Sequence, residues 1–145
     1  MRTLPSDPGH LIVACDGAAR GNPGPAGIGV QITNERGEVL AEVARGLGEA
    51  TNNVAEYTAA IEGLRCAQEL GARTVTVRSD SQLLVNQLTG RYRVKTPHLQ
   101  PLHRQVRNLV AGFDRVSFEH VRRELNTEAD RLANEGVDAW LAGGR

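Results

Sequence analysis

Four acidic residues are placed where a single site could gather them. Asp16 follows the apolar run HLIVAC, Asp80 follows the alternating run RTVTVRS, and Glu56 and Asp130 fall in the first turns of two predicted helices. Ionised carboxylates in one cleft repel each other, so they either take up protons or recruit cations. Oxygen ligands favour Mg²⁺ and Mn²⁺, and two such ions about 3.5–4 Å apart are a known arrangement for phosphodiester displacement. The four acids together therefore indicate a metal-dependent nuclease.

Taken singly, most of these acids have a simpler explanation. The helix dipole alone favours an acid in a first turn, which would account for Glu56 and Asp130. Asp80 precedes Ser81 and could cap a helix. Asp16 is harder to explain, because a carboxylate directly after an apolar strand is costly unless it is solvated, paired or bound to a metal.

The apolar pattern predicts the elements that would position the acids. Strands are predicted over residues 10–15, 27–33, 38–46, 73–79 and 114–121. Helices are predicted over 54–70, 80–90 and 96–112, and from Thr127 with Asn126 as its cap. Three strands followed by helix, strand, two helices, strand and helix imply an α/β fold with a mixed sheet flanked by helices. If the first and fourth strands are parallel neighbours, Asp16 and Asp80 meet at the carboxyl end of the sheet, with Glu56 and Asp130 beside them.

Composition limits the remaining classes. The length of 145 residues suits a single domain. Seventeen basic residues balance seventeen acidic ones, so the net charge gives no indication of nucleic-acid binding. The two cysteines have neither the number nor the spacing of a disulfide framework or a zinc site. With no apolar leader and no stretch long enough to cross a bilayer, we expect a soluble cytoplasmic protein without membrane contact.

Four motifs lie in the order and spacing of one family. DGAARGNPGPAGIG, TNNVAEYTAAI, SDSQLLV and RELNTEADRLAN resemble the type 1 ribonuclease H family, and the resemblance covers about residues 10–140. It implies a mixed five-stranded sheet within one catalytic domain over residues 10–145, preceded by a flexible tail over residues 1–9. So short a tail leaves no separate hybrid-binding domain, and processive binding is not expected.

The resemblance also implies an activity. Members of this family cut the RNA strand of RNA–DNA hybrids and leave 3′-hydroxyl and 5′-phosphate ends. By motif position, Asp16, Glu56, Asp80 and Asp130 resemble the family's four catalytic metal ligands, which would hold two Mg²⁺ or Mn²⁺ ions. The implied partner is the hybrid alone, bound by a monomer.

Further residues match the family's substrate contacts. Those expected to bind the hybrid are Gly17, Asn22, Thr51, Asn52, Asn53 and Gln82. Gly17 would lie against the RNA backbone beside Asp16, and the asparagines and Gln82 could contact 2′-hydroxyls, which distinguish RNA from DNA. Thr51 and Asn22 resemble a pocket for a phosphate of the DNA strand. Helix capping is the alternative for Thr51 and Asn52. Gly21, Gly24 and Gly27 would let the loop turn tightly and approach the sugar–phosphate chain.

The sequence departs from the best-known bacterial pattern in two places. The basic helix that grips the hybrid is replaced by TGRYRVKTPHLQ, where Arg91, Arg93 and Lys95 form a smaller basic patch. The loop before the last helix lacks the usual histidine, and Arg123 is the expected catalytic substitute, with Arg122 as second choice. Two alternatives stay open: a related nuclease acting on double-stranded RNA or branched DNA, and a hybrid-binding module without activity.

Overall fold

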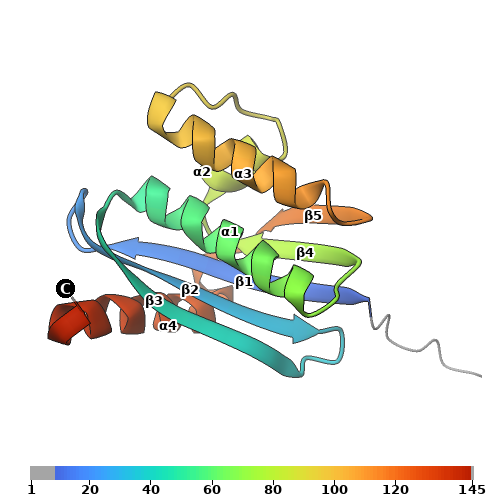
Figure 1. Cartoon of the computed structure of the whole chain (residues 1–145), viewed down its shortest axis with the longest axis horizontal. Coiled ribbons are helices and arrows are strands. Elements are labelled where there is room, and N and C mark those ends of the chain that lie inside the picture. The colour runs from blue at the N-terminus through green and yellow to red at the C-terminus, as the bar shows by residue number, and fades with distance from the viewer. Residues whose placement is uncertain (1–8, 145) are drawn as a thin grey trace, which may run out of the picture.

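One mixed sheet of five strands organises the chain (Figure 1). A computed structural model describes residues 9–144. The strands are β1 (His10–Ala19), β2 (Gly24–Asn34), β3 (Val39–Ala50), β4 (Thr74–Ser79) and β5 (Arg115–His120). They lie in the order β3-β2-β1-β4-β5, with β1 antiparallel to β2 and parallel to β4. The expected neighbour relation between the first and fourth strands is therefore confirmed.

Helices cover both faces of this sheet. They are α1 (Asn52–Glu69), α2 (Gln82–Leu88), α3 (Gln100–Val110) and α4 (Thr127–Ala139), with short 3₁₀ turns at Pro97–Leu99 and Arg123–Leu125 and a final turn at Trp140–Gly144. In Figure 1, α1 lies across the middle of the sheet with α3 beside it, and α4 lies on the other side under β2 and β3. The division of the second crossover into two helices is confirmed.

β2 packs against a helix layer on each of its two faces, with α1 on one side and α4 on the other. Ile28, Val30 and Ile32 alternate along the strand and join the core under α1, which includes Leu64 and Tyr57. The intervening positions point to α4, since successive side chains of a strand alternate between faces. A β-carbon on Gly27 would lie 2.6 Å from the carbonyl oxygen of Ala133, so only glycine lets α4 approach this closely. The expectation that Gly27 faces a sugar–phosphate chain is wrong, because the residue is buried beneath α4.

Gly9, which the sequence places in the predicted tail, is bonded to the start of β4. The carbonyl oxygen of Gly9 accepts hydrogen bonds from the amides of Arg73 and Thr74, at 2.7 and 3.0 Å. The rest of the predicted tail, residues 1–8, lies outside the described residues. Within the described part of the chain, none of the helices has the length and apolar character needed to span a membrane.

Candidate active site

Three carboxylates converge at the carboxyl end of β4, where its pairing with β1 ends. Asp16, Glu56 and Asp80 each offer an oxygen, and these oxygens lie within 4.8 Å of one another. Asp80 directly follows β4, as predicted. Ser81, whose hydroxyl accepts from the amide of Leu84, is the cap of α2, so helix capping does not account for Asp80.

Asp16 does not end its strand. The parallel pairing of β1 with β4 stops at Ala14 opposite Arg78, but β1 continues beside β2 to Ala19, and Asp16 pairs with Gly29. The prediction of a strand end is wrong because the glycine-rich segment stays extended against β2. Asp16 therefore lies inside a hydrogen-bonded strand, just beyond its last parallel partner, and is only 6% exposed.

Glu56 is held by hydrogen bonds from two neighbouring segments. Its Oε1 accepts from the backbone amide of Gly17 at 2.9 Å, and its Oε2 accepts from the hydroxyl of Ser79 at 3.5 Å. Because α1 begins at Asn52 and not at Val54, Glu56 lies in the second turn and not the first. The helix dipole, which acts mainly on the first turn, is therefore a weak explanation for this buried acid.

Ser79 was missed by sequence reasoning. It occupies the last position of β4 on the same face as Val75 and Val77, and all three are buried. Its hydroxyl donates to Glu56 and accepts from the amide of Ser81 at 3.0 Å. The alternation in TVTVRS was the available signal, because it places the serine on the core face of the strand.

Burial and mutual repulsion disfavour the charged form of these acids. Burial, followed by the charges of Glu56 and Asp80, raises the pKa of Asp16 from its ordinary 3.8 to about 9. Burial raises the pKa of Glu56 from 4.5 to about 7, although the amide of Gly17 opposes that shift. Burial likewise raises the pKa of Asp80, and the positive charge of Arg123 acts in the opposite direction.

This donor set fits a divalent cation. Its ligands are all carboxylate oxygens, the choice of Mg²⁺ and Mn²⁺ rather than of zinc or copper. A bound cation would also offset the repulsion that now raises the pKa of these groups. The three acids open into a cavity of about 530 Å³. Asp130, in the first turn of α4, lines the same cavity but is not part of the tight cluster of three.

Comparison with known proteins agrees with this arrangement. A family model described as reverse transcriptase-like matches residues 14–136. The ribonuclease HI of Halobacterium salinarum is 42% identical over 134 residues, a match covering 92% of this chain and 67% of that protein. The chain belongs to the ribonuclease H family. The solved structure of LC11-RNase H1 in complex with an RNA/DNA hybrid is 44% identical, with a TM-score of 0.87 over 90% of this chain and 99% of that chain.

A longer relative matches this chain over only part of its own length. A bifunctional protein of Mycobacterium tuberculosis is 48% identical over 130 residues, which cover 89% of this chain but only 36% of that protein. The chain thus spans about a third of the length of this relative. The mixed five-stranded sheet that the resemblance implied is confirmed, and the structure adds its strand order, β3-β2-β1-β4-β5.

Only some of the residues that the ribonuclease H resemblance assigns to substrate binding line the cavity. Gly17, Asn52 and Asn53 line the cavity. The side-chain oxygen of Asn52 accepts from the amide of Ala19 at 3.1 Å, and that of Asn22 accepts from the amide of Asn52 at 3.1 Å. Thr51 is the cap of α1, as its alternative explanation required. The remaining residue, Gln82, is exposed at the start of α2, outside the residues lining the cavity.

A glycine at position 17 has a structural reason that sequence reasoning did not find. A β-carbon there would lie 2.6 Å from the carbonyl oxygen of Ala55. We expect Gly17→Ala to push α1 and Glu56 away from β1, costing about 1–3 kcal/mol of unfolding free energy. Gly112→Ala is the matched control, because its nearest new contact is the flexible end of Gln68 at 3.0 Å. Urea denaturation of both variants measures the difference, and equal midpoints would contradict this account.

Asn126 plays a different part from the predicted cap. It precedes α4 as expected, but its amide nitrogen donates to the carbonyl oxygen of Cys15 at 3.0 Å instead of its oxygen capping the helix. Its Oδ1 has no hydrogen-bond partner among the described residues 9–144. The residue therefore joins the start of α4 to the strand position just before Asp16.

Arg123 and three polar residues that sequence reasoning missed also line the cavity. Arg123 lies there as predicted, whereas Arg122 pairs with Glu124, Nε to Oε1, at 3.4 Å. The missed polar residues are Arg20, Ser81 and Asn134. Arg20 and Asn134 gave no sequence signal, because they reach the site only through the packing of α4 against the turn after β1.

Proposed function

We propose that the chain is an endoribonuclease that hydrolyses the RNA strand of RNA–DNA hybrids and leaves 3′-hydroxyl and 5′-phosphate ends. The observation that carries this proposal is the cluster of Asp16, Glu56 and Asp80, with their oxygens within 4.8 Å of one another at a cavity of about 530 Å³. The similarity to LC11-RNase H1, whose structure contains an RNA/DNA hybrid, supports the choice of substrate.

The clustered Asp16, Glu56 and Asp80, together with Asp130 from α4, would hold two Mg²⁺ or Mn²⁺ ions. When bound, such ions activate water and stabilise a leaving oxygen at phosphorus. The chain itself fixes the ligands: the amide of Gly17 and the hydroxyl of Ser79 orient both oxygens of Glu56. The strand pairing on both sides of β1 similarly restrains the backbone at Asp16.

Recognition of RNA would fall to the rim formed by the start of α1. The oxygen of Asn52 is engaged by the amide of Ala19, so its NH₂ group is left to donate to a 2′-hydroxyl. Asn53 is exposed beside it on the same cavity. Arg91, Arg93 and Lys95 lie exposed beyond α2 and would add phosphate contacts, each of which makes binding more sensitive to salt.

A panel of labelled duplexes tests the proposal. Hybrid, double-stranded RNA and double-stranded DNA, including a branched form, are incubated with the protein in Mg²⁺, in Mn²⁺ and in excess chelator. Cleavage of only the RNA strand of the hybrid, and only with metal, is expected. Cleavage of another duplex in its place would assign a different substrate, and metal-dependent hybrid binding without cleavage would indicate a binding module.

Arg123 is expected to assist turnover. It lines the cavity, and its charge lowers the pKa of Asp80. An arginine stays protonated near neutral pH, so it would act on phosphate charge or product release and not as a base. We expect Arg123→Ala to slow hybrid cleavage roughly tenfold at saturating substrate.

Arg122→Ala provides the matched comparison, because that side chain pairs with Glu124 outside the cavity lining. Its cleavage rate is expected to match the wild type. A reversed result, with the larger loss in Arg122→Ala, would transfer the role to Arg122.

A further inference from the structure

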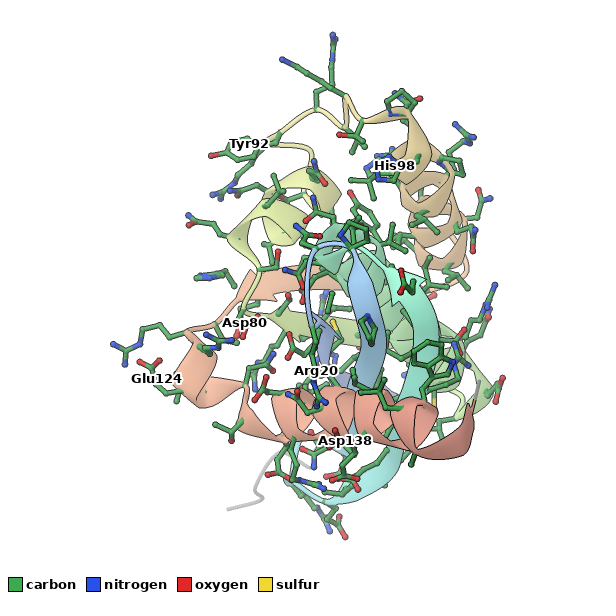
Figure 2. The ribbon with its side chains drawn as sticks, turned by 90° about the vertical axis from the view of Figure 1, so that its left-hand side faces the viewer. Arg20, Asp80, Tyr92, His98, Glu124 and Asp138 are labelled. Atoms are coloured by element: carbon green, nitrogen blue, oxygen red, sulfur yellow. The ribbon has the colours of Figure 1, made fainter. Side chains whose placement is uncertain are left out.

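The turn after β1 is tied to α4 by the side chain of Arg20. Its Nη1 lies 2.7 Å from an oxygen of Asp138, and its Nη2 donates to the side-chain oxygen of Asn134 at 3.2 Å. Figure 2 shows Arg20 just above α4, the helix that carries Asp138. Arg20 and Asn134 both line the cavity that holds the clustered acids.

Asn134 connects this turn to the fourth acid. Asp130, Asn134 and Asp138 are spaced four residues apart on α4, so they lie on one face of the helix. The side-chain nitrogen of Asn134 donates to the carbonyl oxygen of Asp130 at 3.0 Å and lies 3.4 Å from its Oδ1. A continuous chain of polar contacts therefore runs from Arg20 through Asn134 to Asp130.

The chemistry of the Arg20 and Asn134 side chains fixes the direction of these hydrogen bonds. An asparagine amide has one oxygen that accepts and one NH₂ group that donates, whereas a guanidinium only donates. Arg20 must therefore meet the oxygen of Asn134, which leaves the NH₂ group facing Asp130. Without Arg20, the oxygen of Asn134 loses this donor, and the amide is held only through its NH₂ group at Asp130.

We propose that Asn134 is a positioning residue for Asp130, and that Arg20 acts through Asn134 by setting the orientation of its amide. The role in hydrolysis rests on the proposed function. Arg20 and Asp138 expose 42% and 66% of their side chains, so their ion pair adds little to stability. Arg20 therefore contributes by orienting the side-chain amide of Asn134.

A double-mutant cycle tests this inference. Asn134→Leu removes the amide at nearly the same size, and Arg20→Met removes the guanidinium but keeps an apolar stem. We expect kcat at saturating hybrid and Mg²⁺ to fall about tenfold to a hundredfold in Asn134→Leu, with little change in KM. Arg20→Met should show a smaller loss, and the double variant should be no slower than Asn134→Leu alone. Arg131→Met is the control, since Arg131 pairs with Glu128 and Glu135 on α4 outside the cavity lining.

A second measurement does not depend on activity. In metal-free protein, the side-chain NH₂ signals of Asn134 can be assigned by NMR from their loss in Asn134→Leu. Arg20→Met should shift these signals, while Arg131→Met should leave them in place. If Asn134→Leu does not fold, sequential assignment of the wild-type protein identifies the same NH₂ signals, and the exposed Arg20 still allows the test with Arg20→Met.

Three results would overturn the inference. Independent, multiplying losses in the double variant would mean that Arg20 acts on the substrate and not through Asn134. Single-variant rates equal to that of Arg131→Met would remove any positioning role. Unchanged Asn134 signals in Arg20→Met would show that the guanidinium does not set the amide. A wild-type protein that fails to cut hybrid would instead contradict the proposed function, and the NMR result would still decide whether Arg20 orients Asn134.

Discussion

Asp16→Asn is expected to abolish hybrid cleavage while making the metal-free protein more stable. Asparagine keeps the size of the side chain but removes the charge that would face the metal ions. Asp16 is only 6% exposed, and burial with the charges of Glu56 and Asp80 raises its pKa to about 9. At pH 7 the neutral amide should therefore increase the unfolding free energy, by up to about 4 kcal/mol.

The two halves of this result are measured separately. A cleavage assay in Mg²⁺ gives the loss of turnover, and hybrid binding in Ca²⁺ should persist, because the recognition rim at α1 is unchanged. Chemical denaturation in chelator gives the gain in stability. Asp114→Asn, an exposed acid in the loop before β5, is the control for both. Turnover near that of the wild type would remove Asp16 from the metal ligands.

Much of the fold was predictable because local patterns and chain order agree. Continuous apolar residues before Asp16, alternation in RTVTVRS and the glycine after Leu70 are local signals, and the structure has the corresponding elements with ends shifted by a few residues. The crossover through α1 makes β4 parallel to β1, but chain order does not show that the two strands are neighbours, and this part of the prediction was conditional until the structure confirmed it. The pairing brings Asp16 beside Asp80, so the core of the site follows from chain order together with that condition.

The predictions that were wrong concern residues whose contacts are with segments distant in the sequence. Gly27 was placed against the substrate because its neighbours form a loop motif, but only the position of α4 reveals that the residue packs beneath it. Asn126 was assigned as a cap from its place before α4, whereas the strand carbonyl of Cys15 takes its donor. Nothing local to Arg20 indicates that Asn134, 114 residues away, accepts its hydrogen bond. Sequence patterns describe the elements better than the contacts between them.

The stability of the metal-free protein should fall as the pH rises. The pKa of Asp16 is raised from 3.8 to about 9, and that of Glu56 from 4.5 to about 7. Between these limits the folded chain holds protons that the unfolded chain has released, so each rise in pH favours unfolding. The decline should be steepest between about pH 4.5 and 7, where both acids contribute, and should continue for Asp16 up to about pH 9.

Divalent ions should reverse this trend. Only ionised carboxylates bind the metal, so the affinity and the stabilisation by Mg²⁺ or Mn²⁺ increase as the pH rises. Thermal unfolding in chelator and in excess Mg²⁺, followed from about pH 5 to about pH 9, should give two curves that diverge with pH. Asp16→Asn should make the metal-free stability less dependent on pH and reduce the difference between the Mg²⁺ and chelator curves. This comparison distinguishes the effect of the site from that of other titrating groups. A gap that stays constant with pH, or that is as wide in Asp16→Asn as in the wild type, would mean that the ions bind elsewhere than at these buried acids.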